Sequence, residues 1–421
     1  MLGRIAVGFS TILPVSLATM GPARAGTTTA FEQLGSDING GTGWDEFGYA
    51  VATSQDGSRV AIGSWGYENY STIGRVDVYE WDGTTWSQLG TGTMGEATSD
   101  GFGFSVALSN DGTRLAVGAY LNDGGGSNSG HVRVYDWNGT AWAQTGADID
   151  GASTGDYSGS SLALSSNGSR LAIGSPKHDA DRGHVRVFDW TGTAWVQTGL
   201  DIDGEAINDR LGTSVTISAD GNRLAIGAPG NDGTGEDSGH VRIYNWTGTA
   251  WVQTGTDIDG DYTGDQFGSS VAISEDGSWL AIGAPLNDGN GSNSGHVRIY
   301  VWNGVAWEQW DGDIDGRAVG VYSGWAVALA RDASRLVVGA PYSSPVGHVR
   351  VFGLPVDDTP TPPDPPGDDL DPIDYLPDWS LRMPTVQELP DTGGTSPFLL
   401  VIGAVLILAG FTLSTNRRMK I

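Results

Sequence analysis

The chain has 421 residues with no cysteine, 66 glycines and a formal net charge of -28. The lack of cysteine excludes disulfides, thiol catalysis and cysteine-ligated metal sites, and the strong acidity excludes binding to the acidic backbone of nucleic acids. Glycine is abundant without the three-residue period of collagen, and the content of large apolar residues is too high for a disordered chain.

Residues 1–25 have the organisation of a secretory signal peptide. Arg4 supplies a positive charge, residues 5–18 form an apolar run, and an A-x-A cleavage site ends at Ala25. Cleavage is therefore expected between Ala25 and Gly26, which predicts a secreted protein. Retention of the run as an N-terminal anchor is the alternative, although the run is short for a membrane span.

The body of the chain, residues 26–353, is an internal repeat whose units begin near residues 45, 100, 156, 209, 265 and 321. Each unit contains four strand-like segments. Turn pairs such as Asp111-Gly112 and Asn138-Gly139 separate them, and glycine suits tight hairpins because it adopts positive φ without penalty. A four-stranded antiparallel unit present in six copies predicts an all-β fold, a six-bladed β-propeller.

The sixth unit ends near residue 353 without a fourth strand, and a matching strand lies at the start of the mature chain. Residues 31–40 resemble residues 251–260, which contain the fourth strand of another unit. We therefore predict that residues 31–38 complete the last blade and close the ring. The alternative is an open array of repeats. An open array would gain no stability from having the fourth strand of the last unit at the start of the chain.

Two short motifs recur at fixed places in the units. Phe-Gly begins the first strand and Gly-Ala-Pro ends the second, as in Phe267-Gly268 and residues 283–285. This pattern resembles FG-GAP repeats, which integrin α-subunit propellers and many secreted bacterial proteins carry, and the resemblance covers residues 31–352. It implies a β-propeller and leaves the function open. Integrin propellers have seven blades, and the unit count here departs from that.

The resemblance also raises the question of calcium. Integrin-type repeats bind Ca²⁺ between strands one and two, but turns such as residues 275–277 carry too few carboxylates here for six to eight oxygen ligands. A different motif, D-x-D-G-x4-D, joins the fourth strand of the second, third and fourth units to the next unit, and the copy at Asp313 has Val321 in place of the last aspartate. It lies on the face that also carries the long loops between strands two and three. It makes Ca²⁺ a candidate cofactor, with turn-forming aspartates as the alternative. The candidate ligands are Asp148, Asp150, Asp156, Asp201, Asp203, Asp209, Asp257, Asp259 and Asp265.

Other repeated side chains favour structural roles. One repeat position holds a histidine in each of five units, which places the imidazoles around a ring rather than around one ion; these are His131, His184, His240, His296 and His348. The arginine two residues after each histidine is expected to bond loop carbonyls or neighbouring aspartates. Tryptophan pairs such as Trp137 and Trp142 are expected to pack across strands, with stacking on sugars as the alternative.

Enzyme motifs are absent from the sequence: it contains no H-E-x-x-H, G-x-S-x-G or P-loop pattern. Repeated carboxylates favour a repeated structural task over catalysis, although a glycosidase pair is compatible with the composition. Residues 177–179 of the third unit and 65–70 of the first depart from the repeat, and both fall between strands two and three. A unique site is expected there or at the ring axis.

The C-terminal part carries a spacer and a three-part signal. Residues 354–388 are rich in proline and aspartate and predict a semi-rigid spacer. The three parts that follow are the pentapeptide Leu389-Pro390-Asp391-Thr392-Gly393, an apolar run at 398–413 and a basic end with Arg417, Arg418 and Lys420. Residues 389–421 thus resemble the cell-wall sorting signal of Gram-positive surface proteins. The resemblance implies cleavage by a sortase between Thr392 and Gly393, with the apolar helix in the membrane until then.

Together these features predict a secreted protein displayed at the cell surface. It would be anchored to the cell wall, or to the membrane by a retained single-pass helix, and would bind an extracellular protein or glycan. Sortase is the expected processing partner, and no nucleic-acid partner is expected. The alternatives are a secreted carbohydrate-active hydrolase or lyase on a propeller, and a structural envelope component without a discrete ligand.

Overall fold

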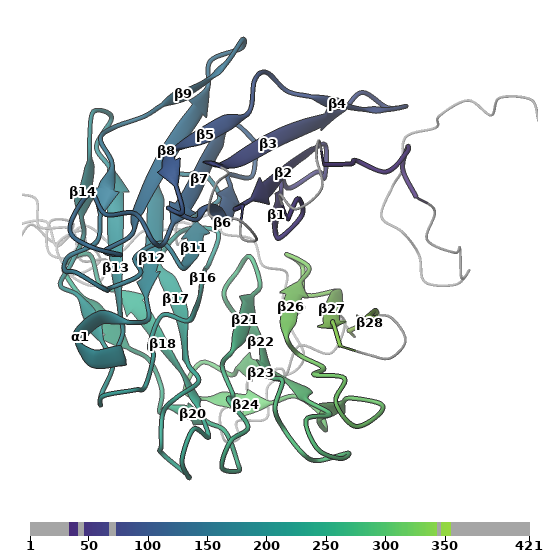
Figure 1. The fold of residues 1–421 in the computed structure, drawn as a ribbon. Helices are drawn as coiled ribbons and strands as arrows, with labels where there is room; N and C mark the ends of the chain where they lie inside the picture. The colour runs from purple at the N-terminus through teal and green to yellow at the C-terminus, as the bar shows by residue number, and fades with distance from the viewer. Residues whose placement is uncertain (1–32, 41–45, 67–72, 343–346, 355–421) are drawn as a thin grey trace, which may run out of the picture. The chain divides into compact units, whose positions relative to one another are not determined.

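The computed structural model describes residues 33–40, 46–66, 73–342 and 347–354 (Figure 1). The predicted signal peptide with its cleavage site between Ala25 and Gly26, the sorting signal with its apolar run, and all of the predicted spacer except Leu354 lie outside these residues. No helix in the described part of the chain has the length and apolar character needed to cross a membrane.

The described residues form six antiparallel sheets, one for each predicted unit. The first contains β1 (Ala50–Thr53), β2 (Arg59–Ser64), β3 (Ile73–Trp81), β4 (Trp86–Gln88) and β5 (Thr93–Thr98). The second contains β6 (Phe102–Leu108), β7 (Arg114–Ala119), β8 (His131–Trp137), β9 (Trp142–Gln144) and β10 (Ile149–Asp150). The third contains β11 (Ser161–Leu164), β12 (Arg170–Ser175), β13 (His184–Trp190), β14 (Trp195–Gln197) and β15 (Ile202–Asp203), with the short helix α1 (His178–Asp181) between β12 and β13.

The remaining sheets repeat this order. The fourth contains β16 (Ser214–Ile217), β17 (Arg223–Ala228), β18 (His240–Trp246), β19 (Trp251–Gln253) and β20 (Ile258–Asp259). The fifth contains β21 (Ser270–Ile273), β22 (Trp279–Ala284), β23 (His296–Trp302), β24 (Trp307–Gln309) and β25 (Ile314–Asp315). The sixth contains only β26 (Ala326–Leu329), β27 (Arg335–Ala340) and β28 (His348–Gly353), so the predicted loss of its fourth strand is confirmed within the described residues.

The predicted fourth strand is present but broken into two pieces. In the second unit β9 and β10 both pair with β8, so that Trp142 lies opposite Trp137 and Ile149 lies opposite Val132. Gly146 between them has φ +86, and a Cβ added there would lie 3.0 Å from Trp195 of the next unit. The ladder is therefore interrupted where a neighbouring ring approaches the backbone.

Successive sheets contact each other through their first strands: β1 with β6, β6 with β11, β11 with β16, β16 with β21 and β21 with β26. The two repeated glycine motifs make this approach close. A Cβ on Gly227, from Gly-Ala-Pro, would overlap the carbonyl oxygen of Gly268, from Phe-Gly of the next unit. The same oxygen accepts a hydrogen bond of 2.7 Å from Ser214 Oγ. Both motifs therefore serve the contact between units.

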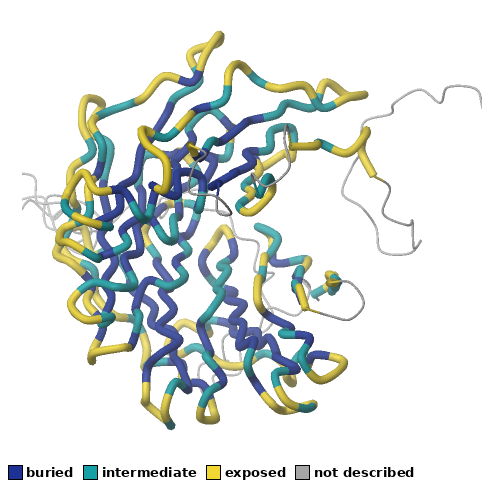
Figure 2. The backbone as a smooth tube through the Cα atoms, viewed as in Figure 1, coloured by how far each residue is buried: buried dark blue, intermediate teal, exposed yellow. Residues whose placement is uncertain are grey.

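The apolar core lies between neighbouring sheets. In one cluster Val185 and Val187 of the third unit pack with Leu224 and Ile226 of the fourth, and all four are at most 1% exposed. Figure 2 shows buried residues along the middle of the strands and exposed residues at the loops. Each sheet alone is too thin to bury these side chains, so the sheets depend on their neighbours for stability.

The tryptophan pairs have the packing role that was predicted. The rings of Trp190 and Trp195 are 5.4 Å apart across β13 and β14. Trp195 Nε1 donates a hydrogen bond of 3.1 Å to the Thr145 carbonyl of the preceding unit. The guanidinium of Arg114, also in the preceding unit, lies 5.4 Å from the Trp190 ring. The pairs therefore join neighbouring units near the outer strands.

The N-terminal segment lies against the first unit in the place of a preceding fourth strand. Trp86 Nε1 donates a hydrogen bond of 3.0 Å to the Leu34 carbonyl, which repeats the bond of 3.1 Å from Trp142 to Leu89 one unit later. Among the described residues, however, no strand pairing joins β28 to residues 33–38 or β26 to β1. Val349 on β28 is accordingly 64% exposed, whereas its counterpart Val185 is fully buried.

Candidate functional site

The long loops lie together on one face of the repeat, as the strand order predicts. Gly151, at the start of the loop that leads to the third unit, donates its N–H to the Gly130 carbonyl at 2.8 Å. Ser158 farther along donates to the Ser129 carbonyl at 2.9 Å. The third and fourth units repeat this contact between Gly204 and Gly183. We call this surface, formed by the loops between strands two and three and between units, the long-loop face.

The first aspartate of the acidic motif is held by an arginine. Arg133 donates to the Asp148 carboxylate through Nε at 2.9 Å and Nη2 at 2.8 Å, and Arg242 binds Asp257 in the same manner. Burial alone would raise the pKa of Asp148, but hydrogen bonds from Arg133 and Gln144 outweigh it and lower that pKa. The predicted contact of the arginines with nearby aspartates is therefore present. In the third unit Asp201 keeps the glutamine bond, from Gln197, while Arg186 donates to the Asp150 carbonyl.

The third aspartate of the motif is buried and organises the loop. Asp209 is 2% exposed and accepts hydrogen bonds from the backbone N–H groups of Glu205 at 3.0 Å and Ala206 at 2.8 Å. Asp265 is also buried and accepts a bond of 2.8 Å from Asn287 Nδ2 of the neighbouring long loop. These carboxylates thus tie the two loops of the face together.

The second aspartate of each motif is exposed; these residues are Asp150, Asp203 and Asp259. In the third unit Asp203 lies with Asp201 beside His184. Among the described residues, the third aspartate of a motif does not join the first two in any group of ligand atoms within 4.8 Å. In this arrangement the aspartates do not form a common oxygen shell of the size that Ca²⁺ requires. Calcium binding remains a prediction, and titration of the protein with Ca²⁺ would test it.

Four of the five repeated histidines are buried on their strands, in line with the predicted packing role, and His348 on β28 is partly exposed. His131, His240 and His296 are each 1% exposed. In each of them Nδ1 lies 3.5–3.7 Å from the first aspartate of the motif. Burial lowers the pKa of all three, to about 4 for His296, so these imidazoles are neutral at pH 7.

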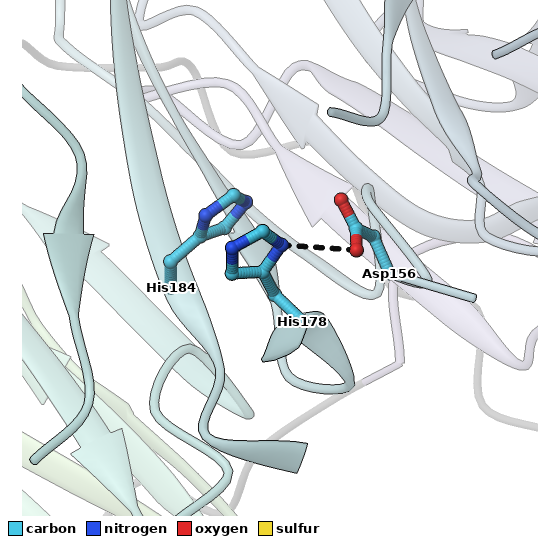
Figure 3. A group of neighbouring side chains, drawn as sticks. All are labelled: Asp156, His178 and His184. Atoms are coloured by element: carbon cyan, nitrogen blue, oxygen red, sulfur yellow. Dashed lines mark hydrogen bonds and ion pairs between the residues drawn. The ribbon is translucent and has the colours of Figure 1, made fainter. Parts of the chain in front are cut away.

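The third unit departs from this arrangement. His178 begins helix α1 and stands at the position that Asn122, Asn231 and Asn287 hold in other units. Its Nδ1 lies 3.0 Å from Asp156 Oδ1, and its ring stacks on His184 with centroids 3.9 Å apart and planes 19° apart (Figure 3). The atypical segment 177–179 was expected to mark a unique site. Its meeting with His184 and Asp156 was not expected, since these residues were assigned to packing and to calcium.

A second departure is a group of aromatic side chains at the long-loop end of the first, second, third and sixth units. The rings form two runs of mutual contacts with centroids 4.2–6.3 Å apart. We call them the aromatic patch: Tyr49, Trp65, Phe104, Tyr120 and Tyr157 in one run, and Tyr322, Trp325 and Tyr342 in the other.

The two runs of the patch lie near each other. Burial, the charge of Glu46 and the nearby Tyr342 raise the pKa of Tyr49, which places Tyr49 and Tyr342 within electrostatic range. Tyr49 and Trp325 are each 50% exposed, and Tyr342 is 59% exposed. The position of Tyr49, Phe104 and Trp325 in the repeat is occupied elsewhere by small hydroxyl residues, Ser160, Thr213 and Ser269. The patch is thus confined to part of the long-loop face.

The sheets, their order and the glycine contacts define an all-β repeat protein of the propeller type. The model of the FG-GAP repeat family matches residues 95–135 and 253–300, and together these observations support an FG-GAP β-propeller. No curated protein sequence matches the chain.

Solved structures resemble the chain at low identity. Hydrazine synthase from Kuenenia stuttgartiensis is 15% identical with a TM-score of 0.50, over 73% of this chain and 84% of that one. A putative 6-phosphogluconolactonase from Bacteroides uniformis is 14% identical with a TM-score of 0.50, over 72% and 80% of the two chains. The Dos1 propeller is 14% identical with a TM-score of 0.42, over 71% and 67%. At this identity the first two likenesses indicate the fold alone.

Proposed function

We propose that this chain is a surface-displayed binding protein whose FG-GAP propeller presents the long-loop face to an extracellular protein or glycan. The aromatic patch carries the proposal. Most side chains of the long-loop face recur from unit to unit and hold the scaffold together, whereas the patch occurs once. A feature that occurs once in a repeat protein is suited to a task that the repeat itself does not require.

The exposure of the patch supports binding. Tyr49, Trp325 and Tyr342 leave half or more of their surface in water, at a cost that a ligand would relieve. Tyrosine and tryptophan offer large contact areas with little conformational entropy to lose. The net charge of -28 disfavours strongly acidic ligands. Neutral glycans and neutral or basic protein surfaces are therefore the expected partners.

The proposal is tested by replacing aromatic residues of the patch with alanine, which is expected to weaken ligand binding. Full-length protein is screened on a glycan array and against extracellular matrix proteins, and Trp325→Ala and Tyr342→Ala are measured on the hits. Each variant is expected to weaken binding about tenfold or more, as for aromatic residues at the centre of an interface. The matched control is Tyr262→Ala, which removes a tyrosine that is 67% exposed and lies outside the patch. Equal affinity of all three variants would refute the role of the patch.

We also propose that the ring has six blades and is closed by residues 31–38. Two observations support closure. Leu34 already receives the tryptophan bond that a preceding fourth strand receives elsewhere, and Gly35 lies under the Trp81 ring as Gly90 lies under Trp137. Val349 and Val351 on β28 are 64% and 45% exposed, and a fourth strand would cover them.

Anchoring at the cell surface rests on the two ends of the sequence. We expect the mature protein to end at Thr392, joined to the cell wall, with Gly393 and the apolar run removed. Mass spectrometry of the C-terminal peptide from cell-wall digests measures this directly. Thr392→Ala is expected to move the protein from the wall fraction to the membrane fraction. A mature chain that still carries Ile421 would instead establish the retained single-pass anchor.

A further inference from the structure

The third unit differs from its neighbours at one buried junction of the long-loop face. In the second, fourth and fifth units an asparagine amide donates to the buried aspartate at the start of the unit, at 2.9, 3.3 and 2.8 Å. In the third unit His178 takes the place of that asparagine, and its Nδ1 lies 3.0 Å from Asp156. An amide that can only hold the loop is thus replaced by an imidazole that can also ligate a metal.

The replacement brings a second imidazole into the same place. His184, the repeated histidine of this unit, is fully buried and stacks against His178 (Figure 3). Of the repeated histidines, it alone has both ring nitrogens buried without a hydrogen-bond partner in the described part of the chain. A buried polar group without a partner is costly, and a ligand that accepts its lone pair would remove that cost.

We propose that Asp156, His178 and His184 form a binding site for one divalent transition-metal ion, with Zn²⁺ as the expected ion. One ligand atom from each residue lies within 4.8 Å of the other two. Two imidazoles and one carboxylate are ligands that Zn²⁺ prefers, and three protein ligands leave a fourth position for water. Ca²⁺ and Mg²⁺ prefer shells of oxygen alone, so the site should discriminate against them.

The surroundings favour a neutral imidazole that is able to bind. His184 is fully buried on β13, and neither of its ring nitrogens has a hydrogen-bond partner in the described part of the chain. The His178 side chain is 23% exposed and opens the site to solvent, whereas the Asp156 side chain is 2% exposed. Because the two rings are nearly parallel, a tetrahedral shell requires one of them to turn, and His178 is the one with room to do so.

The groups of acids around a histidine in the second and fifth units are less suited to a metal. In the second unit His131 lies near Asp148 and Glu96, but Arg133 pairs with both carboxylates. In the fifth unit Arg298 likewise pairs with Asp313, beside His296. The corresponding Arg186 donates instead to the Asp150 carbonyl at 2.6 Å. The third unit therefore combines two imidazoles with a carboxylate, Asp156, that accepts a hydrogen bond from the Ser153 N–H and pairs with His178 rather than with an arginine in the described part of the chain.

The test is a calorimetric titration of the full-length protein, without a histidine tag, with ZnCl₂ at pH 7. Excess CaCl₂ is present to occupy weak carboxylate sites on the surface. We expect one Zn²⁺ per chain. The key variant is His178→Asn, which restores the side chain of the other units and so should keep the fold. It is expected to weaken zinc binding at least tenfold, since one of three ligands is lost.

Two further measurements make the result decisive. Co²⁺ in place of Zn²⁺ should give the strong visible absorption of a tetrahedral site, and His178→Asn should abolish it. Asn287→His places an imidazole beside Asp265 and His296 in the fifth unit, and it is expected to raise the stoichiometry towards two. Unchanged affinity in His178→Asn with an unchanged circular dichroism spectrum would overturn the proposal, as would the absence of saturable binding to the wild type.

Discussion

Gly227→Ala is expected to destabilise the protein by about 3 kcal/mol, as an overpacked contact does. The reason is the close approach of neighbouring sheets. A Cβ at residue 227 would overlap the carbonyl oxygen of Gly268 in the next unit and the hydroxyl of Ser214. The Gly268 oxygen belongs to the backbone just before β21, so it cannot move away without opening the interface between the fourth and fifth units. The Ser214 hydroxyl could rotate away only by losing its hydrogen bond to that oxygen. The midpoint of denaturant unfolding, followed by tryptophan fluorescence, measures the loss.

The matched control for this variant is Gly312→Ala. An added Cβ at residue 312 meets no atom within 4 Å, and the backbone there is outside the positive-φ region. The change in the free energy of unfolding should stay within about 0.5 kcal/mol. If both variants unfolded at the same denaturant concentration, the contact between glycine motifs would not be the tight point of the repeat.

The repeat could be read from the sequence because each unit must satisfy the same contacts. Glycine pairs mark the hairpin turns, and the end of the repeat near residue 353 predicts the three-stranded last sheet that is found in the described part of the chain. The break between β9 and β10 could not be read in this way. The break depends on Trp195 of the next unit, which packs on Gly146. The sequence of one unit does not show which side chain of the next unit packs on it.

The candidate sites were less predictable, because they join residues that are far apart in the chain. Residues 177–179 were visible as a departure from the repeat, but the partners of His178 were not. Asp156 and His184 carry residue types that other units also have at those positions, so nothing in their own segments distinguishes them. Of the aromatic patch, only Trp65 lies in a segment that the sequence singled out, residues 65–70, and the other rings were missed for a similar reason. The rings come from several units, and only the packing of the loops places Tyr120 5.6 Å from Tyr157.

A second prediction tests whether residues 31–38 close the ring. Cysteines placed at Ile38 and Val349 are expected to form a disulfide when the protein is oxidised. In the third and fourth units the equivalent residues, Val185 with Ile202 and Val241 with Ile258, are direct cross-strand partners. Partners in an antiparallel pair have Cα atoms about 4.5–5.5 Å apart, which is a separation that a disulfide can bridge.

The natural chain has no cysteine, so the two new thiols can react only with each other within one molecule. Thiol titration of the oxidised monomer should find none free. The bond would close a loop of about 300 residues and should stabilise the protein by about 6 kcal/mol in the chain-entropy account. In the control, Val349 is paired with Leu200, which is 88% exposed in another unit, and both thiols should stay free. If they also stayed free in the variant with cysteines in place of Ile38 and Val349, residues 31–38 would not be the fourth strand of the sixth sheet. Another segment would then have to cover Val349.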